Sequence, residues 1–150
     1  MNNNDNIAAI DDLKVVLKNK GMKYTEQRAV ILQILLNMKE HLNAEEVLEI
    51  VKKKYPEQKI GIATIYRTLN FLEEVNLISS ISFGKDGKKY EGNNSHHHDH
   101  LICTSCGKIV EFFDECIENK QEDIASRNGF KITDHTMQIF GLCAECQKKN

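Results

Sequence analysis

The sequence lacks the features of a disordered or membrane-embedded chain. Its 150 residues hold one proline and eight glycines, too few for a low-complexity or collagen-like composition. No apolar run approaches the roughly 18 residues that a membrane helix needs, and no basic stretch followed by an apolar one opens the chain. We therefore expect a folded cytoplasmic protein of one or two small domains, with no membrane partner.

Motifs of the common enzyme classes are also missing. The chain has no H-E-x-x-H, no G-x-S-x-G and no glycine-rich loop that could cradle a phosphate. The metallo-hydrolase pattern H-x-H-x-D-H fails because position 100 is His100, and the aspartate falls one place early, at Asp99. We therefore predict a protein that is not an enzyme and has no small-molecule substrate. A zinc-dependent hydrolase or a metal-storage protein is the alternative from another class, and it requires turnover or many ions per chain.

Charge and metal-ligating residues divide the chain into two parts. The total charge is -2, but residues 1–92 carry 14 Lys or Arg against 13 Asp or Glu, whereas residues 93–150 carry 6 against 9. All five cysteines and five of the six histidines lie in the second part, and His41 is the exception. The sequence therefore predicts two domains with different tasks, at 1–92 and 93–150, with metal binding concentrated in the second.

Helical periodicity dominates the first part of the chain. One helix ends near Gly21, a second begins after the N-cap Thr25, and a third opens with a capping box of Asn43 and Glu46 and closes before Pro56. Their apolar positions are Ile10, Leu13, Val16, Leu17, Val30, Ile31, Ile34, Leu35, Val47, Leu48 and Val51. These residues predict a helical cluster with a shared core.

A fourth helix and a hairpin complete this part. From Gly61 a stripe of apolar residues follows helical spacing, at Ile62, Ile65, Leu69 and Leu72, and the opposite face carries Thr64, Arg67 and Asn70. Ile81 and Phe83 then alternate with serines before a turn at 84–87 and a basic strand. The pattern fits a winged helix-turn-helix that binds DNA, and it equally fits a small helical bundle with a solvated face and an ordinary hairpin.

Residues 92–95, Gly-Asn-Asn-Ser, are predicted to be a polar linker between the two domains. Beyond it we expect short strands at 101–102 and 109–110, a helix from about Asp114 to Asn128, and a strand within the alternating stretch Ile132 to Phe140. The fold class is therefore α+β, an N-terminal winged helix-turn-helix followed by a small α+β domain.

Two C-x-x-C pairs predict a structural zinc site. They are Cys103 with Cys106 and Cys143 with Cys146, and 36 residues separate them. Two such pairs supply the four thiolates of a tetrahedral zinc site, which leaves no open position for catalysis. Disulfides or one redox pair are the alternatives, and the expected cytoplasmic location disfavours them. The fifth cysteine, Cys116, is predicted to be a small buried apolar residue, and a reactive thiol is the alternative.

The run His96-His-His-Asp-His100 predicts two further metal sites. Alternate side chains of a strand share a face, so His98 and His100 should point one way and His97 and Asp99 the other. Imidazole and carboxylate together suit Fe(II), Mn(II), Zn(II) or Ni(II). The alternative is a solvated histidine-rich turn.

From about Leu13 to Cys146 the chain resembles the ferric uptake regulator (Fur) family of bacterial metal-dependent repressors. The matching stretches are 21–28 (GMKYTEQR), 61–70 (GIATIYRTLN), 97–103 (HHDHLIC) with 106–108 (CGK), and 143–146 (CAEC). The resemblance implies a homodimer with an N-terminal winged helix and a C-terminal α+β dimerisation domain. It also implies that the partner is a double-stranded, A·T-rich DNA operator.

The same resemblance implies roles for individual residues. Tyr66, Arg67 and Thr64 would contact DNA from the helix in the major groove, Tyr66 on thymine methyl groups or phosphate and Arg67 mainly on phosphate. Lys23 would enter a narrow A·T-rich minor groove, and core packing is the alternative for Tyr66. The implied regulatory metal ligands are His41, Glu91, His98, His100 and Glu111. The implied ligands of a second metal are His97, Asp99, Glu118 and His135.

Glutamate at Glu91 and Glu111 favours an iron-responsive repressor, because peroxide-sensing relatives carry aspartates at these places. The implied cofactors are therefore a structural Zn(II) and a regulatory Fe(II), for which Mn(II) or Zn(II) substitutes. Zinc-, manganese-, nickel- and peroxide-sensing regulators of the same family are the alternatives.

Overall fold

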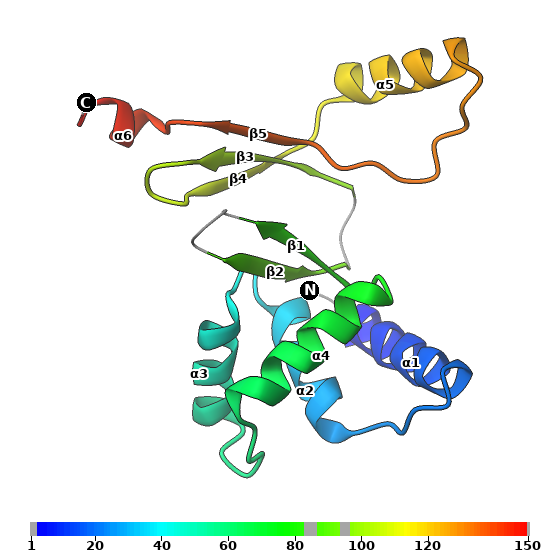
Figure 1. Ribbon diagram of the computed structural model, residues 1–150, viewed down its shortest axis with the longest axis vertical. Helices are drawn as coiled ribbons and strands as arrows, with labels where there is room; N and C mark the ends of the chain where they lie inside the picture. The colour runs from blue at the N-terminus through cyan, green and yellow to red at the C-terminus, as the bar shows by residue number, and fades with distance from the viewer. Residues whose placement is uncertain (1–2, 83–86, 94–96, 150) are drawn as a thin grey trace. The chain divides into compact units, whose positions relative to one another are not determined.

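The computed structural model describes residues 3–82, 87–93 and 97–149, with the side chains of residues 3–5 excepted. The chain forms two compact units, residues 1–95 and 96–150. Helices make up most of the first unit and a small sheet forms the centre of the second (Figure 1). The predicted α+β class is confirmed. Within the described residues, no helix is long and apolar enough to span a membrane.

The first unit is a cluster of four helices with caps of the predicted kind. The helices are α1 (Asn3–Asn19), α2 (Glu26–Asn37), α3 (Ala44–Lys54) and α4 (Ile62–Glu74). Thr25 accepts a hydrogen bond from the backbone N–H of Arg28, and Asn43 and Glu46 form both bonds of a capping box. Gly21 has a φ of 66° directly after α1, a conformation that few other residues tolerate.

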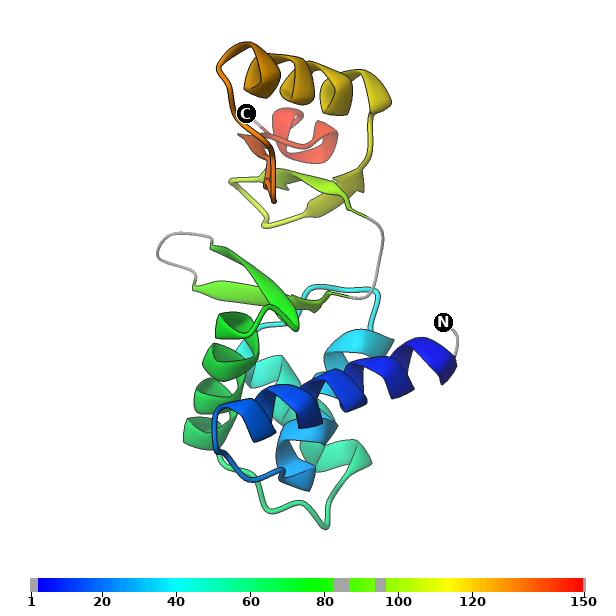
Figure 2. The same cartoon turned by 90° about the vertical axis from the view of Figure 1, so that its right-hand side faces the viewer.

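One apolar core holds these helices together. Leu13, Ile31, Val47, Ile65 and Leu69 each expose 1% or less of their surface there. Each of α2, α3 and the hairpin strand β1 packs against α4 (Figures 1 and 2). Ile62, which was expected in the buried stripe, is 38% exposed, because it is the first residue of α4 and its neighbours on both sides are exposed.

The hairpin after α4 consists of β1 (Ile78–Ser82) and β2 (Lys88–Gly92), paired antiparallel. The expected turn at 84–87 and Phe83 lie outside the described residues, except for Gly87. Gly92, expected in the linker, is instead the last residue of β2. A Cβ on Gly92 would lie 2.7 Å from Leu36 Cδ2 and 3.1 Å from the Leu36 backbone, so glycine is needed for close packing against α2.

The second unit contains a three-stranded sheet in the order β4-β3-β5. Its elements are β3 (Asp99–Cys103), β4 (Ile109–Phe112), α5 (Glu115–Arg127), β5 (Gln138–Gly141) and α6 (Ala144–Gln147). The pair β3–β4 is antiparallel, whereas β3–β5 is parallel. Of the stretch 132–140, which was expected to alternate as a strand, only residues 138–140 lie in β5 and pair with β3. The preceding residues return from α5 and place His135 beside Glu118.

The apolar core of the second unit is small. Ile102, Cys103 and Cys146 are the buried apolar residues among those described in this unit. In Figure 1, α5 lies beside one end of the sheet rather than across its face, and none of its described residues is buried. Cys116, expected to be buried, is therefore exposed near the start of α5.

Candidate functional site

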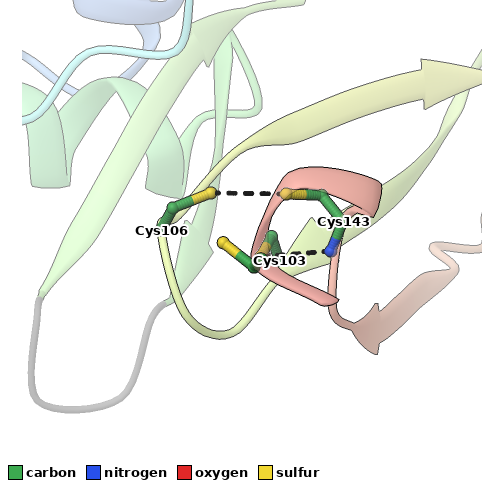
Figure 3. Close-up of side chains that lie close together, drawn as sticks. Cys103, Cys106 and Cys143 are labelled. Carbon is green, nitrogen blue, oxygen red and sulfur yellow. Dashed lines mark hydrogen bonds between the residues drawn. The ribbon is translucent and has the colours of Figure 1, made fainter. Parts of the chain in front are cut away.

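The four cysteines of the two C-x-x-C pairs come together at one end of the sheet. Their Sγ atoms lie within 4.8 Å of one another. Cys103 ends β3, and Gly107 turns the chain back with a φ of 73° and donates its N–H to the Cys103 carbonyl at 2.9 Å. The Sγ atoms of Cys106 and Cys143 lie 3.8 Å apart, and the Cys143 N–H donates to Cys103 Sγ at 3.4 Å; Figure 3 marks both contacts with dashed lines. This arrangement fits a tetrahedral Zn(Cys)4 centre.

Hydrogen bonds within the cluster shift the pKa values of two of these thiols in opposite directions. Hydrogen bonds from the backbone N–H groups of Cys143 and Cys106 lower the pKa of Cys103 to about 6. A hydrogen bond from Ser105 opposes the change at Cys146, but the thiols of Cys143 and Cys106 raise its pKa to about 11. The hydrogen bonds to Cys103 therefore favour its thiolate, the form that binds zinc.

A second cluster joins β3 to α5 and to the segment before β5. Its members are His97, Asp99, Glu118 and His135, whose ligand atoms lie within 4.8 Å of one another. Glu118 Oε1 is 3.5 Å from His97 Nε2 and 3.4 Å from His135 Nε2. Asp99 is 1% exposed.

Four buried polar atoms of this cluster lack a hydrogen bond, although ion-pair distances of 3.4–3.5 Å join the side chains. Both carboxylate oxygens of Asp99, Oε1 of Glu118 and Nε2 of His135 are buried without one among the described residues. Burying a neutral polar group without a hydrogen bond costs roughly 1–3 kcal/mol, and burying a charged group costs more. A divalent cation held by two imidazoles and two carboxylates removes this cost, so the residues present fit a metal ion.

On the first unit, His41 and Glu91 form a pair of metal-ligating side chains. His41 Nε2 lies 2.9 Å from Glu91 Oε2, and Ser79 Oγ donates to Glu91 Oε1 at 3.3 Å. Two backbone hydrogen bonds between Leu42 and Tyr90, of 3.0 and 2.7 Å, hold the neighbouring residues in an isolated bridge. This bridge fixes His41 next to the strand that carries Glu91.

On the second unit, His98, His100 and Glu111 gather on the face of β3 opposite to Asp99. His100 is the cross-strand partner of Glu111, and His98 Nε2 lies 3.7 Å from Glu111 Oε1. The rings of His98 and His100 have centroids 4.9 Å apart. The division of the histidine run between two faces follows from strand parity. His96 lies outside the described residues.

The residues expected to contact DNA all lie on the first unit. Lys23 is exposed in the loop before α2, and Thr64, Tyr66 and Arg67 lie in the first two turns of α4. Tyr66 is 42% exposed, so its ring is not a core residue. Its hydroxyl donates to Glu45 Oε1 at 3.0 Å, and Arg67 donates to Thr64 Oγ1 at 3.3 Å.

Two neighbours of these residues were not predicted. Glu45 holds the Tyr66 hydroxyl, and Arg28 donates to the Lys23 carbonyl at 2.6 Å. Neither contact follows from a motif or from helical periodicity, because each joins residues that only the tertiary fold or the loop conformation brings together.

Comparison with known proteins agrees with this geometry. The model of the ferric uptake regulator family matches residues 19–140. The ferric uptake regulation protein of Campylobacter jejuni is 46% identical over 93% of this chain and 89% of its own, and that of Helicobacter pylori is 37% identical over 93% and 91%.

Solved structures give the same result. The Helicobacter pylori ferric uptake regulator Fur, whose structure is described as revealing three functional metal binding sites, superposes with a TM-score of 0.83 and 37% identity, covering 95% of this chain and 93% of its own. The Pseudomonas aeruginosa ferric uptake regulator with manganese gives a TM-score of 0.76 and 30% identity, covering 87% and 97%.

Proposed function

This chain belongs to the ferric uptake regulator family of metal-dependent transcriptional regulators, and from that premise we propose that it is a homodimeric, Fe(II)-responsive repressor of iron-uptake genes that binds A·T-rich operators. The observation that carries metal binding is the second unit's set of buried carboxylate and imidazole atoms without hydrogen-bond partners, which belong to the second-metal cluster. Iron is favoured by the relatives, which are ferric uptake regulation proteins, and by glutamate at Glu91 and Glu111.

The four cysteines hold a structural zinc. A site filled by four thiolates has no position for water or substrate, so zinc there supplies cross-linking and no catalysis. The ion ties the end of β3 to α6, within a unit that buries few apolar residues. We assign Zn(II) at Cys103, Cys106, Cys143 and Cys146 to folding of the second unit.

The regulatory ion takes ligands from both units. His41 and Glu91 supply two donors from the first unit, and His98, His100 and Glu111 supply three from the second. Neither group alone offers the four to six ligands that a divalent transition metal takes. The ion binds more tightly to the conformation in which more of these ligands are within its reach. That conformation therefore gains population when the ion is available. His97, Asp99, Glu118 and His135 hold the second metal, which orders the second unit.

DNA is read by α4 and by the loop before α2. Arg67 and Thr64 contact phosphates, Tyr66 contacts thymine methyl groups, and Lys23 enters the minor groove of an A·T-rich segment. Narrow A·T-rich grooves concentrate negative potential, which attracts a lysine. The net charge of the chain is only -2, so affinity depends on this local surface rather than on the whole molecule.

The dimer forms through the sheet of the second unit. Leu101 is the cross-strand partner of both Val110 and Ile139, so the three side chains form a row on one face. They are 42%, 44% and 45% exposed. An apolar row of this kind, on a unit with a small core, is covered by the same face of a second copy.

The function is tested by operator binding in anaerobic titrations. Zinc-containing protein is titrated with Fe(II), Mn(II), Zn(II) or Ni(II) at fixed salt, because phosphate contacts make affinity salt-dependent. We expect Fe(II), and Mn(II) as its surrogate, to raise affinity. A response only to Zn(II) or Ni(II) overturns the iron assignment. The double variant His98→Ala/His100→Ala should lose the response and keep its thiolate-bound zinc, whereas the control His96→Ala should keep both. An unchanged response in the double variant overturns the regulatory site.

A further inference from the structure

The proposed DNA-reading residues lie on two separate elements. Lys23 lies in the loop between α1 and α2, and Tyr66 lies on α4. A protein that reads the minor groove with one residue and the major groove with another needs a fixed distance between them. An exposed loop alone does not fix that distance.

Arg28 connects these two elements. It is the third residue of α2. Its Nη1 donates to the Lys23 carbonyl oxygen at 2.6 Å, and its guanidinium carbon lies 5.3 Å from the centroid of the Phe71 ring. Phe71 is on α4, on the same helix as Tyr66 and Arg67. One side chain from α2 therefore contacts both the loop of Lys23 and the helix that reads the major groove.

The chemistry of arginine suits this double contact. Its planar guanidinium donates hydrogen bonds from its edge while its face lies on an aromatic ring, and lysine offers no such plane. The Lys23 contact uses the backbone carbonyl, so the Lys23 ammonium is left for DNA. The Arg28 backbone N–H also bonds Thr25 Oγ1 at 3.4 Å, which anchors the start of α2 to the same loop.

We propose that Arg28 is a positioning residue that sets Lys23 at a fixed place relative to α4, so that minor-groove readout depends on a residue that does not itself contact DNA. This inference rests on the proposed function. It assigns a specificity role to Arg28 and Phe71 that acts through Lys23.

The test uses operators that differ only in the minor groove. Replacing A·T pairs of the Lys23 segment by G·C adds a 2-amino group to that groove, whereas inosine·C pairs lack it. Wild-type protein with Mn(II) should bind the inosine operator more tightly than the G·C operator. Arg28→Gln should lose most of that preference, with a loss of affinity of about tenfold. Discrimination between thymine and uracil, which reports on Tyr66, should be unchanged.

A double-mutant cycle separates positioning from direct contact. In a Lys23→Ala background, Arg28→Gln should cost little further affinity. If Arg28→Gln costs the same affinity in both backgrounds, and the slope of log affinity against log salt shows the loss of about one more phosphate contact, Arg28 contacts DNA directly. That result overturns the proposal. Arg28→Lys should lack the preference for the inosine operator as Arg28→Gln does, because lysine cannot contact both the Lys23 carbonyl and the Phe71 ring. A full inosine preference in Arg28→Lys would also overturn the proposal.

Two further variants test the contact with the ring and provide a control. Phe71→Leu keeps apolar bulk and removes the ring face, so it should weaken the inosine preference in part. Arg127→Gln, at an exposed ion pair with Asp123 on α5, should leave the preference intact. Equal loss of thymine and inosine discrimination, with a lowered melting temperature, would make Arg28 merely structural. If wild-type protein binds none of the operators with any metal, the proposed function fails, and that outcome differs from all of these.

Discussion

Tyr66 combines an exposed ring with a hydroxyl that is already bonded. The hydrogen bond to the Glu45 carboxylate raises the pKa of Tyr66 above its ordinary value, with a smaller contribution from desolvation. The ring is therefore free to meet a thymine methyl group, whereas the hydroxyl must leave Glu45 before it can meet a phosphate. This favours base contact over phosphate contact for Tyr66.

Glu45→Gln should lower the pKa of Tyr66 towards its ordinary value of 10.0, because the amide has no negative charge to oppose the phenolate. The measurement is an NMR titration of tyrosine labelled at Cζ, with Tyr66→Phe to assign the resonance. Glu49→Gln, on the same helix, is the control. An unchanged Tyr66 titration in Glu45→Gln would show that the hydrogen bond is not formed in solution.

Gly92 is a residue whose role depends on space rather than on backbone freedom. Gly92→Ala should destabilise the first unit by about 1–3 kcal/mol, because the added Cβ meets the Leu36 backbone, which cannot move aside. Urea unfolding monitored by circular dichroism measures the loss. Gly141→Ala, where an added Cβ meets nothing within 4 Å, should cost much less. Equal stability of Gly92→Ala and wild type would contradict the packing.

At the scale of elements, Glu73 ties α4 to the hairpin. It accepts hydrogen bonds from Ser80 on β1 and from Lys88 on β2, the latter at 3.1 Å. Burial alone would raise the pKa of Glu73, but these bonds outweigh it and hold the pKa below the ordinary value of 4.5. The stabilisation is therefore complete above the unfolded pKa, and it is lost as the pH falls through the lowered pKa.

Glu73→Gln should lower the free energy of unfolding at pH 7 by about 0.5–1 kcal/mol, since the group is partly exposed. The difference from wild type should shrink as the pH falls below the pKa of Glu73, where both proteins carry a neutral side chain. Urea unfolding at several pH values measures it. Glu74→Gln, which removes an exposed ion pair with Lys20, is the control and should show a smaller effect. A difference that persists at low pH would rule out the charge as its cause.

The cysteine pairs are the elements that substitute for an apolar core in the second unit. Cys143→Ser should lose zinc, increase exposure of the sheet to hydrogen exchange and weaken dimerisation, because folding of a small metal domain depends on the ion. Zinc content by mass spectrometry and mass by sedimentation check this. Cys116→Ser, at an exposed thiol outside the cluster, should change neither. A zinc-free Cys143→Ser dimer with full protection would refute the structural role.

Local signals allowed most of these elements to be predicted. Thr25, Asn43 and the stripe at Ile65 depend on neighbours within one helix, so the sequence alone indicates them. Features that depend on distant contacts could not be predicted in this way. The packing of Gly92 on Leu36 depends on the tertiary fold, and the exposure of Cys116 follows from the position of α5 away from the sheet.

The residues of the candidate site also differ in how far local sequence predicts them. Cysteine spacing and strand parity indicated which residues of 97–106 and 143–146 work together, because these are properties of neighbouring residues. Only the family resemblance implied Glu118, His135 and His41 as ligands, since each is far along the chain from the residues it meets. Neither the local sequence nor the resemblance predicted the roles of Glu45 and Arg28, because no motif marks a positioning residue.

At the scale of the whole molecule, we expect the dimer to depend on the exposed row of Leu101, Val110 and Ile139. Leu101→Glu should convert the dimer to a monomer, because a charge at the centre of a buried apolar face costs several kcal/mol. Sedimentation equilibrium measures the mass. Operator affinity should fall with it, because the second half-site contact is lost. Val15→Glu, at an exposed apolar residue of α1, is the control and should remain dimeric. A dimeric Leu101→Glu protein would place the interface elsewhere.

The parallel pairing of β3 with β5 has a consequence during synthesis. The described core of the first unit is drawn from residues 13–90, so it is complete once that segment has left the ribosome. The sheet of the second unit instead waits for residues 138–141, and its cysteine cluster waits for residues 143–146. Closing so long a loop is slow compared with forming helices from near neighbours. A nascent chain can therefore complete its helical unit before the sheet and the cysteine cluster of the second unit form.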